Sequence, residues 1–157
     1  IWNSVVHSIR YVLDAADGDA YNDAWQTPGE TQQLGSGDCE DASLYLADWL
    51  IARGFDARVA LGHYAERGGH AWVIVRLDGL TYLLESTNPD ADTSRPPLLD
   101  EVGSRYVPDS TIDREGFHAR RNPSAPWDGD YWTLAKWQHV SPNGKGSVAS
   151  AEAGAEH

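Results

Sequence analysis

The spacing of apolar residues predicts two helices in the first third of the chain. Residues 2–16 repeat apolar side chains at the interval of an amphipathic helix. A second helix is predicted to begin at Asp38 and to end at Gly54, because glycine favours helix termination. The apolar positions are Val5, Ile9, Val12, Leu13 and Ala16 in the first segment, and Ala42, Leu46, Trp49 and Leu50 in the second. The stretch between the two segments carries few helix or strand signals.

After Gly54 the apolar period changes to two, which is typical of strands. Strands are predicted at Phe55–Tyr64, at His70–Leu77 and at Leu80–Ser86. The last two strands are joined by Asp78-Gly79, a dipeptide that favours a two-residue hairpin turn. Two helices followed by antiparallel strands predict an α+β fold.

The second half of the chain has weaker periodicity and several prolines. Short strands are predicted at Arg105–Val107 and Gly116–Arg120, and Asp130–Val140 is an aromatic-rich closing element whose type the pattern does not determine. Residues 141–157 are rich in Gly, Ala, Ser and Glu, which predicts a disordered tail. We therefore expect a single domain over residues 1–140.

Chain length and net charge argue against a membrane-spanning protein and against a nucleic-acid-binding protein. The chain has 157 residues and no apolar run near the roughly 18 residues of a membrane span, so we expect neither membrane insertion nor a signal peptide. Its 24 acidic and 12 basic residues give a formal net charge of -12. Such a charge repels phosphate backbones, so nucleic acid is excluded as a partner. We expect a monomer.

The only cysteine, Cys39, is the candidate nucleophile. It lies in the first turn of the second predicted helix, where unpaired backbone N–H groups favour a thiolate and can hold an oxyanion. Gly35 and Gly37 give the preceding backbone the freedom to expose the thiol. We expect a thiol pKa below the usual value of about 8.5. The alternative is an inert residue at a helix start.

The predicted hairpin supplies a base and an acid for this thiol. If Leu77 faces Leu80, then His70 faces Thr87, and Glu85 lies diagonally from His70 on the same face of the sheet. A carboxylate in that position can fix the imidazole tautomer, as in a nucleophile–base–orienter triad. The alternative for Glu85 is a charge that protects an edge strand from aggregation.

Four motifs in this region resemble the transglutaminase-like superfamily, and most nearly its bacterial cysteine proteinases. They are WQTPGET (Trp25–Thr31), GSGDCEDA (Gly35–Ala42), GGHAWVIV (Gly68–Val75) and LLEST (Leu83–Thr87). The resemblance implies a papain-like fold with the catalytic helix packed on a small antiparallel sheet. It implies Cys39, His70 and Glu85 as the triad, although the family usually has Asp as the acid. It also favours a periplasmic or secreted location, with a cytoplasmic location as the alternative.

The family often adds an oxyanion donor from the segment before the cysteine. Trp25, Gln26 and Gln33 are the candidates here. The sequence does not choose among them.

Three acids around the thiol present an electrostatic conflict. Asp38, Glu40 and Asp41 should raise the pKa of the Cys39 thiol unless a cation balances them. Carboxylates are ligands that Ca²⁺ prefers, and the resemblance associates this box with calcium. The alternatives are that the acids only cap the helix, or that zinc is bound by Cys39, His63 and His70.

These observations together predict a thiol hydrolase, a cysteine peptidase or amidase, that acts on a protein or peptide through a thioester. This chemistry requires no cofactor. The acids around Cys39 suggest Ca²⁺ as a bound ion. A protein-glutamine transglutaminase and a catalytically silent binding module of the same fold are the alternatives.

Overall fold

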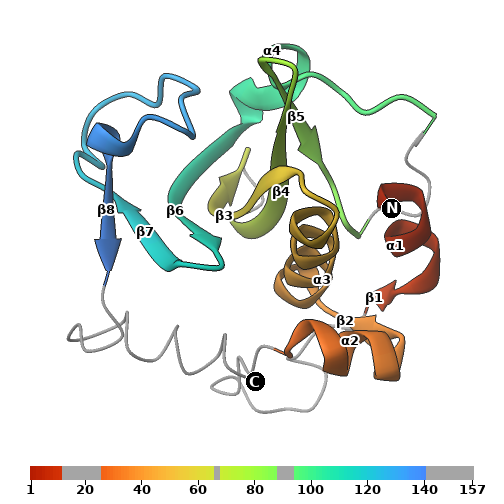
Figure 1. Ribbon diagram of the computed structural model, residues 1–157. Coiled ribbons are helices and arrows are strands. Elements are labelled where there is room, and N and C mark those ends of the chain that lie inside the picture. The colour runs from red at the N-terminus through yellow and green to blue at the C-terminus, as the bar shows by residue number, and fades with distance from the viewer. Residues whose placement is uncertain (12–25, 66–67, 88–93, 141–157) are drawn as a thin grey trace.

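A six-stranded antiparallel sheet with strand order β5-β4-β3-β6-β7-β8 organises the described part of the chain, and helix α3 packs against one of its faces (Figure 1). The structure is a computed structural model that describes residues 1–11, 26–65, 68–87 and 94–140. The helices are α1 (Trp2–Ser8), α2 (Pro28–Leu34), α3 (Cys39–Ala52) and α4 (Leu99–Val102), with short 3-10 turns at Gly103–Arg105 and Leu134–Lys136. The strands are β1 (Arg10–Tyr11), β2 (Ser36–Gly37), β3 (Asp56–Tyr64), β4 (Gly69–Leu77), β5 (Leu80–Leu84), β6 (Tyr106–Asp113), β7 (Gly116–Arg120) and β8 (Trp137–Val140). This arrangement confirms the predicted α+β class.

Helix α3 and the sheet face beneath it form the main core. Leu46 is fully buried against Val59 and Val73, which project from neighbouring strands. Burial of each such side chain contributes about 1.5–3 kcal/mol to stability. The helix begins after Asp38 and its chain turns away at Gly54, where φ is +89°. The α3 boundaries therefore agree with the sequence pattern.

Aromatic side chains cover the opposite face of the sheet. Trp72 and Tyr131 are fully buried there, and the indole N–H of Trp72 donates to the Tyr131 hydroxyl at 3.2 Å. Trp137 and Tyr106 belong to the same cluster. The aromatic closing segment thus consists of a 3-10 turn and strand β8, and its rings complete this second core.

The β4–β5 hairpin has the predicted turn and register. Leu77 pairs with Leu80, and Asp78 and Gly79 both have positive φ angles, as a tight hairpin turn of this type requires. The ladder stops at the pair of Val73 with Leu84, so the predicted pairing of His70 with Thr87 is wrong. The chain leaves the sheet here because other elements bind it: the indole N–H of Trp2 donates to the Glu85 carbonyl at 2.7 Å, and the Ser86 hydroxyl bonds that of Ser43 in α3 at 2.9 Å.

The first predicted helix is shorter than its apolar spacing indicates. Helix α1 ends at Ser8, and β1 then pairs in parallel with β2. The amide of Arg10 donates to the carbonyl of Gly35 at 2.9 Å, so pairing with a distant segment replaces helix propagation. Val12–Ala16 of the predicted helix lie outside the described residues, as does the predicted tail over residues 141–157.

Helix α2 is an element that the apolar pattern did not predict. It begins with a capping box, in which the Thr27 side chain accepts from the Glu30 amide and the Glu30 carboxylate accepts from the Thr27 amide. Pro28 occupies the first helical position, which also favours a helix start. The run Thr-Pro-Gly-Glu therefore contained a helix signal independent of hydrophobicity.

Strand β6 is longer than the short strand predicted at Arg105–Val107, and it approaches β3 closely at Gly62. The register shifts between Leu61 and Gly62, and an ideal Cβ on Gly62 would lie 2.1 Å from the carbonyl oxygen of Val107. Only glycine fits this approach. Gly62 of β3 also pairs with His70 of β4. The close contact at Gly62 therefore brings the start of β6 near the start of β4, where His70 lies.

None of the helices in the described residues is long and apolar enough to cross a membrane.

Candidate active site

Cys39 is the first residue of α3 and is 8% exposed. A reciprocal capping box fixes this turn: the Asp38 side chain accepts from the Asp41 amide at 3.0 Å, and the Asp41 side chain accepts from the Asp38 amide at 3.1 Å. An ideal Cβ on Gly37 would lie 2.6 Å from the Asp41 Cβ, so glycine is required beside the box. The sequence around the cysteine therefore specifies a rigid helix start.

His70 and Glu85 are brought together as the sequence predicted, although by a different backbone path. The Nε2 atom of His70 lies 2.9 Å and 3.0 Å from the two carboxylate oxygens of Glu85. An ionised carboxylate only accepts hydrogen bonds, so this contact favours the tautomer with the proton on Nε2. Nδ1 is then the nitrogen that can accept a proton.

The thiol lies against the strand that carries His70. The backbone N–H of Ala71, the residue after His70, forms a hydrogen bond with the Cys39 sulfur. Helix α3 thus presents the thiol to the beginning of β4. The three residues expected to form a triad come from α3, from β4 and from the segment that follows β5.

Burial raises the pKa of the Cys39 thiol well above its usual value, and the adjacent Glu40 carboxylate raises it further. The sulfur lies 3.2 Å from Glu40 Oε2, so the thiol donates to this carboxylate. The hydrogen bond from Ala71 acts in the opposite direction and is the weaker influence. The expected lowering of the thiol pKa is therefore wrong for this state, because desolvation and a neighbouring negative charge outweigh the helix N-terminus.

The three acids around Cys39 have different environments. Asp41 is fully buried, and its second oxygen accepts from the Gln26 amide at 2.6 Å. Asp38 is buried in the capping box, and Glu40 faces the thiol. In the described part of the chain these acids do not converge as one set of ligand atoms, and neither do Cys39, His63 and His70.

The oxyanion candidates are separated by the structure. Gln26 lies close to the start of α3, because Asp41 binds its amide and the Thr31 hydroxyl donates to its side-chain oxygen at 3.0 Å. Gln33 is exposed in the last turn of α2. Trp25 lies outside the described residues. Gln26 is thus the candidate whose backbone is bound to the helix that carries the thiol.

Tyr106 contacts Glu85, and the sequence analysis did not predict this contact. Its hydroxyl donates to Glu85 Oε1 at 2.6 Å, and its ring packs against Tyr64 and Trp72 with centroids 4.6 Å and 5.0 Å away. Burial raises the pKa of the Tyr106 phenol, as does the Glu85 charge. No local motif signals this contact, because it depends on the register between β3 and β6.

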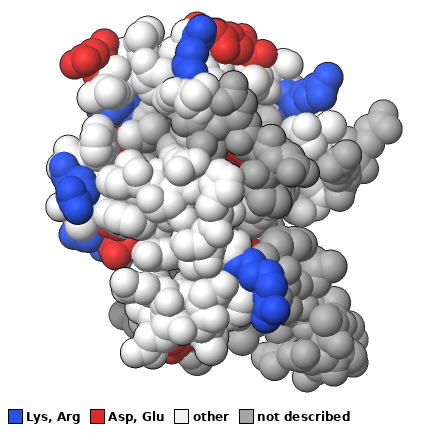
Figure 2. All heavy atoms as spheres, turned by 90° about the vertical axis from the view of Figure 1, so that its right-hand side faces the viewer, with Lys and Arg blue, Asp and Glu red and all other residues white. Residues whose placement is uncertain are grey.

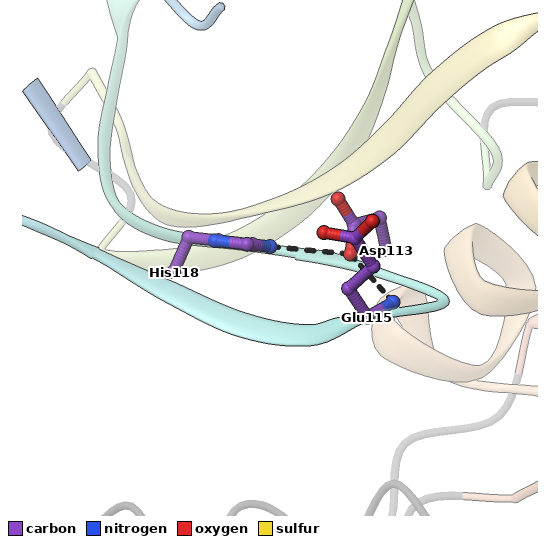
Figure 3. Close-up of side chains that lie close together, drawn as sticks. All are labelled: Asp113, Glu115 and His118. Atoms are coloured by element: carbon purple, nitrogen blue, oxygen red, sulfur yellow. Dashed lines mark hydrogen bonds and ion pairs between the residues drawn. The ribbon is translucent and has the colours of Figure 1, made fainter. Parts of the chain in front are cut away.

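A second polar group lies on the β6–β7 hairpin (Figure 3). Asp113 Oδ1 accepts from the Glu115 amide at 2.8 Å and lies 3.2 Å from the buried His118 Nε2, while Asp113 Oδ2 lies 3.7 Å from Arg58. These contacts account for the group as a turn with an ion pair, since Arg58 balances the charge of Asp113.

One family model and several solved structures support a relationship of this chain to the transglutaminase-like peptidases. The family model described as "CEP76 peptidase-like domain" matches residues 23–98, a range that contains Cys39, His70 and Glu85. This finding confirms the relationship that the four motifs predicted. A comparison with curated proteins gives no match.

Solved structures of LapG from Legionella pneumophila have a similar fold. One has a TM-score of 0.57 and 21% identity, and the match covers 74% of this chain and 64% of that chain. The calcium-bound form has a TM-score of 0.61 and 18% identity, and the match covers 96% of this chain and 75% of that chain. The EGTA-treated form has a TM-score of 0.59 and 21% identity, and the match covers 76% of this chain and 64% of that chain. The chain therefore spans less than two thirds of the first of these LapG chains.

Proposed function

We propose that this chain is a thiol peptidase in which Cys39 is the nucleophile, His70 the general base and Glu85 the residue that orients His70. The observation that carries the proposal is the contact of His70 Nε2 with both carboxylate oxygens of Glu85, beside a thiol bound to the neighbouring Ala71 amide. A thiol, an imidazole and a carboxylate from these three segments are the groups that a nucleophile, a base and an orienter require, which supports the proposal.

The reaction would proceed in two halves. His70 Nδ1 takes the thiol proton as the Cys39 sulfur forms a bond to the amide carbon of the substrate. The C–N bond then breaks, and His70 returns the proton to the leaving amine. Water, deprotonated by His70, then attacks the thioester carbon. The C–S bond breaks, the acyl group leaves as a carboxylic acid, and the proton on His70 regenerates the Cys39 thiol. The backbone N–H of Cys39 at the helix start and the side-chain amide of Gln26 are the proposed oxyanion donors.

The substrate is proposed to be a protein or peptide. The face that carries α1 shows uncharged side chains over much of its area (Figure 2). Because Trp2 of α1 binds the Glu85 carbonyl, this face adjoins the site. An uncharged approach suits a polypeptide better than a highly charged ligand. Attack of a lysine amine on the same thioester would give transglutamination instead.

Glu40 is proposed as the acid that binds calcium, because Asp38 is buried in its capping box and the three acids do not converge as one set of ligand atoms. Asp41 does not fit the ligand set, because backbone amides bind both of its oxygens and it is fully buried. The Glu40 carboxylate lies 3.2 Å from the Cys39 sulfur, and LapG has been solved in a calcium-bound form. A bound cation would supply positive charge beside the thiol and so favour the thiolate.

Alkylation of Cys39 tests the nucleophile. Because the thiol pKa is raised, the thiolate fraction at pH 7 is low, and we expect iodoacetamide labelling in EGTA to be slow and to accelerate with rising pH. Millimolar Ca²⁺ should increase the rate at pH 7 about tenfold or more, since each unit of pKa changes the thiolate fraction about tenfold. In EGTA, Glu40→Gln should also increase it by removing the adjacent charge. The rate of mass increase measures each effect.

Two histidine variants separate catalysis from general effects. His70→Ala should lower the labelling rate in Ca²⁺ because the thiol loses its base, whereas His63→Ala should leave the rate unchanged, because His63 is exposed and pairs with Asp109. Equal labelling rates for wild type and His70→Ala in both EGTA and Ca²⁺ would contradict the proposed enzymatic function and favour a catalytically silent binding module. Hydrolysis of a fluorogenic peptide and incorporation of a fluorescent amine then distinguish peptidase from transglutaminase.

Thermal melts test the metal without relying on activity. Ca²⁺ bound only by the folded chain should raise the melting temperature in proportion to the logarithm of its concentration above Kd. Mg²⁺ should raise it less, because it prefers a small octahedral site and retains its waters. Glu40→Gln should weaken the calcium response. The melts need about 0.15 M salt, where the Debye length is near 8 Å, so that the net charge of -12 attracts few ions non-specifically. Overlapping melting curves in EGTA and in Ca²⁺ would contradict calcium binding and would mean that the acids around Cys39 only cap the helix.

A further inference from the structure

We infer that Tyr106 is a positioning residue that holds the Glu85 carboxylate for His70; the inference rests on the proposed function. Glu85 Oε1 receives two hydrogen bonds, one from the Tyr106 hydroxyl at 2.6 Å and one from His70 Nε2 at 2.9 Å. The other oxygen lies 3.0 Å from the same Nε2. A carboxylate can rotate about its terminal torsion, and the phenol fixes that rotation.

The phenol is suited to this role because it is a buried donor. Tyr106 is 6% exposed, and its ring lies between those of Tyr64 and Trp72. Its burial beside Glu85 keeps the hydroxyl protonated through the neutral range. A hydroxyl that stays protonated donates to a carboxylate and does not compete with it for the imidazole proton.

The backbone brings this donor to the acid from another strand than the one that carries His70. Tyr106 begins β6 and pairs with Tyr64 at the end of β3, while His70 lies on β4, which flanks β3 on the other side. The Trp2 indole binds the backbone carbonyl of Glu85, so the main chain of the acid is bound separately from its side chain. Glu85 is thus held by α1 through its carbonyl and by β6 through its carboxylate, and His70 approaches a carboxylate that is already oriented.

The chemical consequence concerns the tautomer of His70. A fixed carboxylate keeps the imidazole proton on Nε2 and leaves Nδ1 available to the thiol. Without the phenol, Glu85 rotates more freely, and the imidazole samples the tautomer with the proton on Nδ1. That tautomer cannot accept the thiol proton at Nδ1.

Tyr106→Phe removes the hydroxyl and keeps the ring, and Tyr131→Phe is the matched control. Tyr131 is also a buried tyrosine, and its hydroxyl accepts from Trp72 without contacting Glu85. We expect Tyr106→Phe to lower kcat for a peptide substrate about tenfold with KM unchanged, the size expected for a lost hydrogen bond to a charged group. Tyr131→Phe should leave kcat near the wild-type value while lowering the melting temperature.

Imidazole ¹⁵N spectra of the same proteins give a readout that does not depend on turnover. The His70 signals, assigned by comparison with His70→Ala, should show the Nε2–H tautomer in wild type and in Tyr131→Phe, and a mixture in Tyr106→Phe. Wild type should also show a slowly exchanging Tyr106 hydroxyl proton, a measurement that remains valid if Tyr106→Phe does not fold. Unchanged His70 signals in folded Tyr106→Phe, or no such proton in wild type, would overturn the inference. Absence of turnover in wild type with the expected spectra would instead contradict the proposed function alone.

Discussion

Glu85→Gln is expected to lower kcat by about 10²–10⁴-fold while leaving the fold intact. An amide of the same shape still contacts His70 and still accepts from Tyr106, but it carries no charge to stabilise the imidazolium that forms during acyl transfer. Its NH₂ group can also face Nε2 and favour the wrong tautomer. The measurement is kcat on a fluorogenic peptide, with circular dichroism to establish folding.

Glu101→Gln is the matched control for this change. Glu101 is a surface glutamate that pairs with the exposed Arg95, so its neutralisation should leave kcat unchanged. Full activity of Glu85→Gln would mean that another acid orients His70, such as Asp90 or Asp92, which lie outside the described residues.

Gly62→Ala is expected to destabilise the fold by about 3 kcal/mol, at the upper end of the range for overpacking. The new Cβ would lie 2.1 Å from the Val107 carbonyl oxygen and 2.7 Å from the Pro108 Cα, both of them backbone atoms. Neither can rotate away, so β6 must move from β3. Urea denaturation measures the loss, and activity should fall as well because β6 carries Tyr106.

Gly69→Ala is the control for the loss of a glycine in a strand of the same sheet. Nothing lies within 4 Å of its ideal Cβ, and its φ is not in the left-handed region. We expect this variant to change stability by less than about 1 kcal/mol, in the stabilising direction, because alanine restricts the unfolded chain. Equal stability of the two variants would contradict a close approach at Gly62.

The parts of the site that the sequence predicted are those governed by short-range rules. A helix start at Cys39 follows from capping residues beside it, and the proximity of His70 and Glu85 follows from the Asp78-Gly79 turn, which fixes the register of its own hairpin. In each case the residues that decide the geometry are close in sequence. The ladder ends earlier than predicted, yet the long glutamate side chain still reaches the imidazole.

The parts that it did not predict depend on how distant segments pack. The pKa of Cys39 reflects burial against β4 and the orientation of Glu40, neither of which a helix N-terminus reveals. Tyr106 reaches Glu85 only because the register shifts at Gly62, which one sequence does not show. Asp41, grouped with the metal ligands by spacing alone, binds backbone amides instead.

The N-terminal segment contacts both sides of the site across long separations in sequence. Trp2 binds the carbonyl of Glu85, and β1 pairs with the strand that directly precedes Asp38 and Cys39. Helix α1 has seven residues and strand β1 has two, and such short elements open at a lower free energy than central strands do, without unfolding of the whole domain. Opening of α1 and β1 would release the acid and the helix start at once while the sheet stays intact. Loss of catalytic alignment therefore precedes loss of structure, and enzyme activity should be a more sensitive probe of local opening than any spectroscopic measure of the sheet.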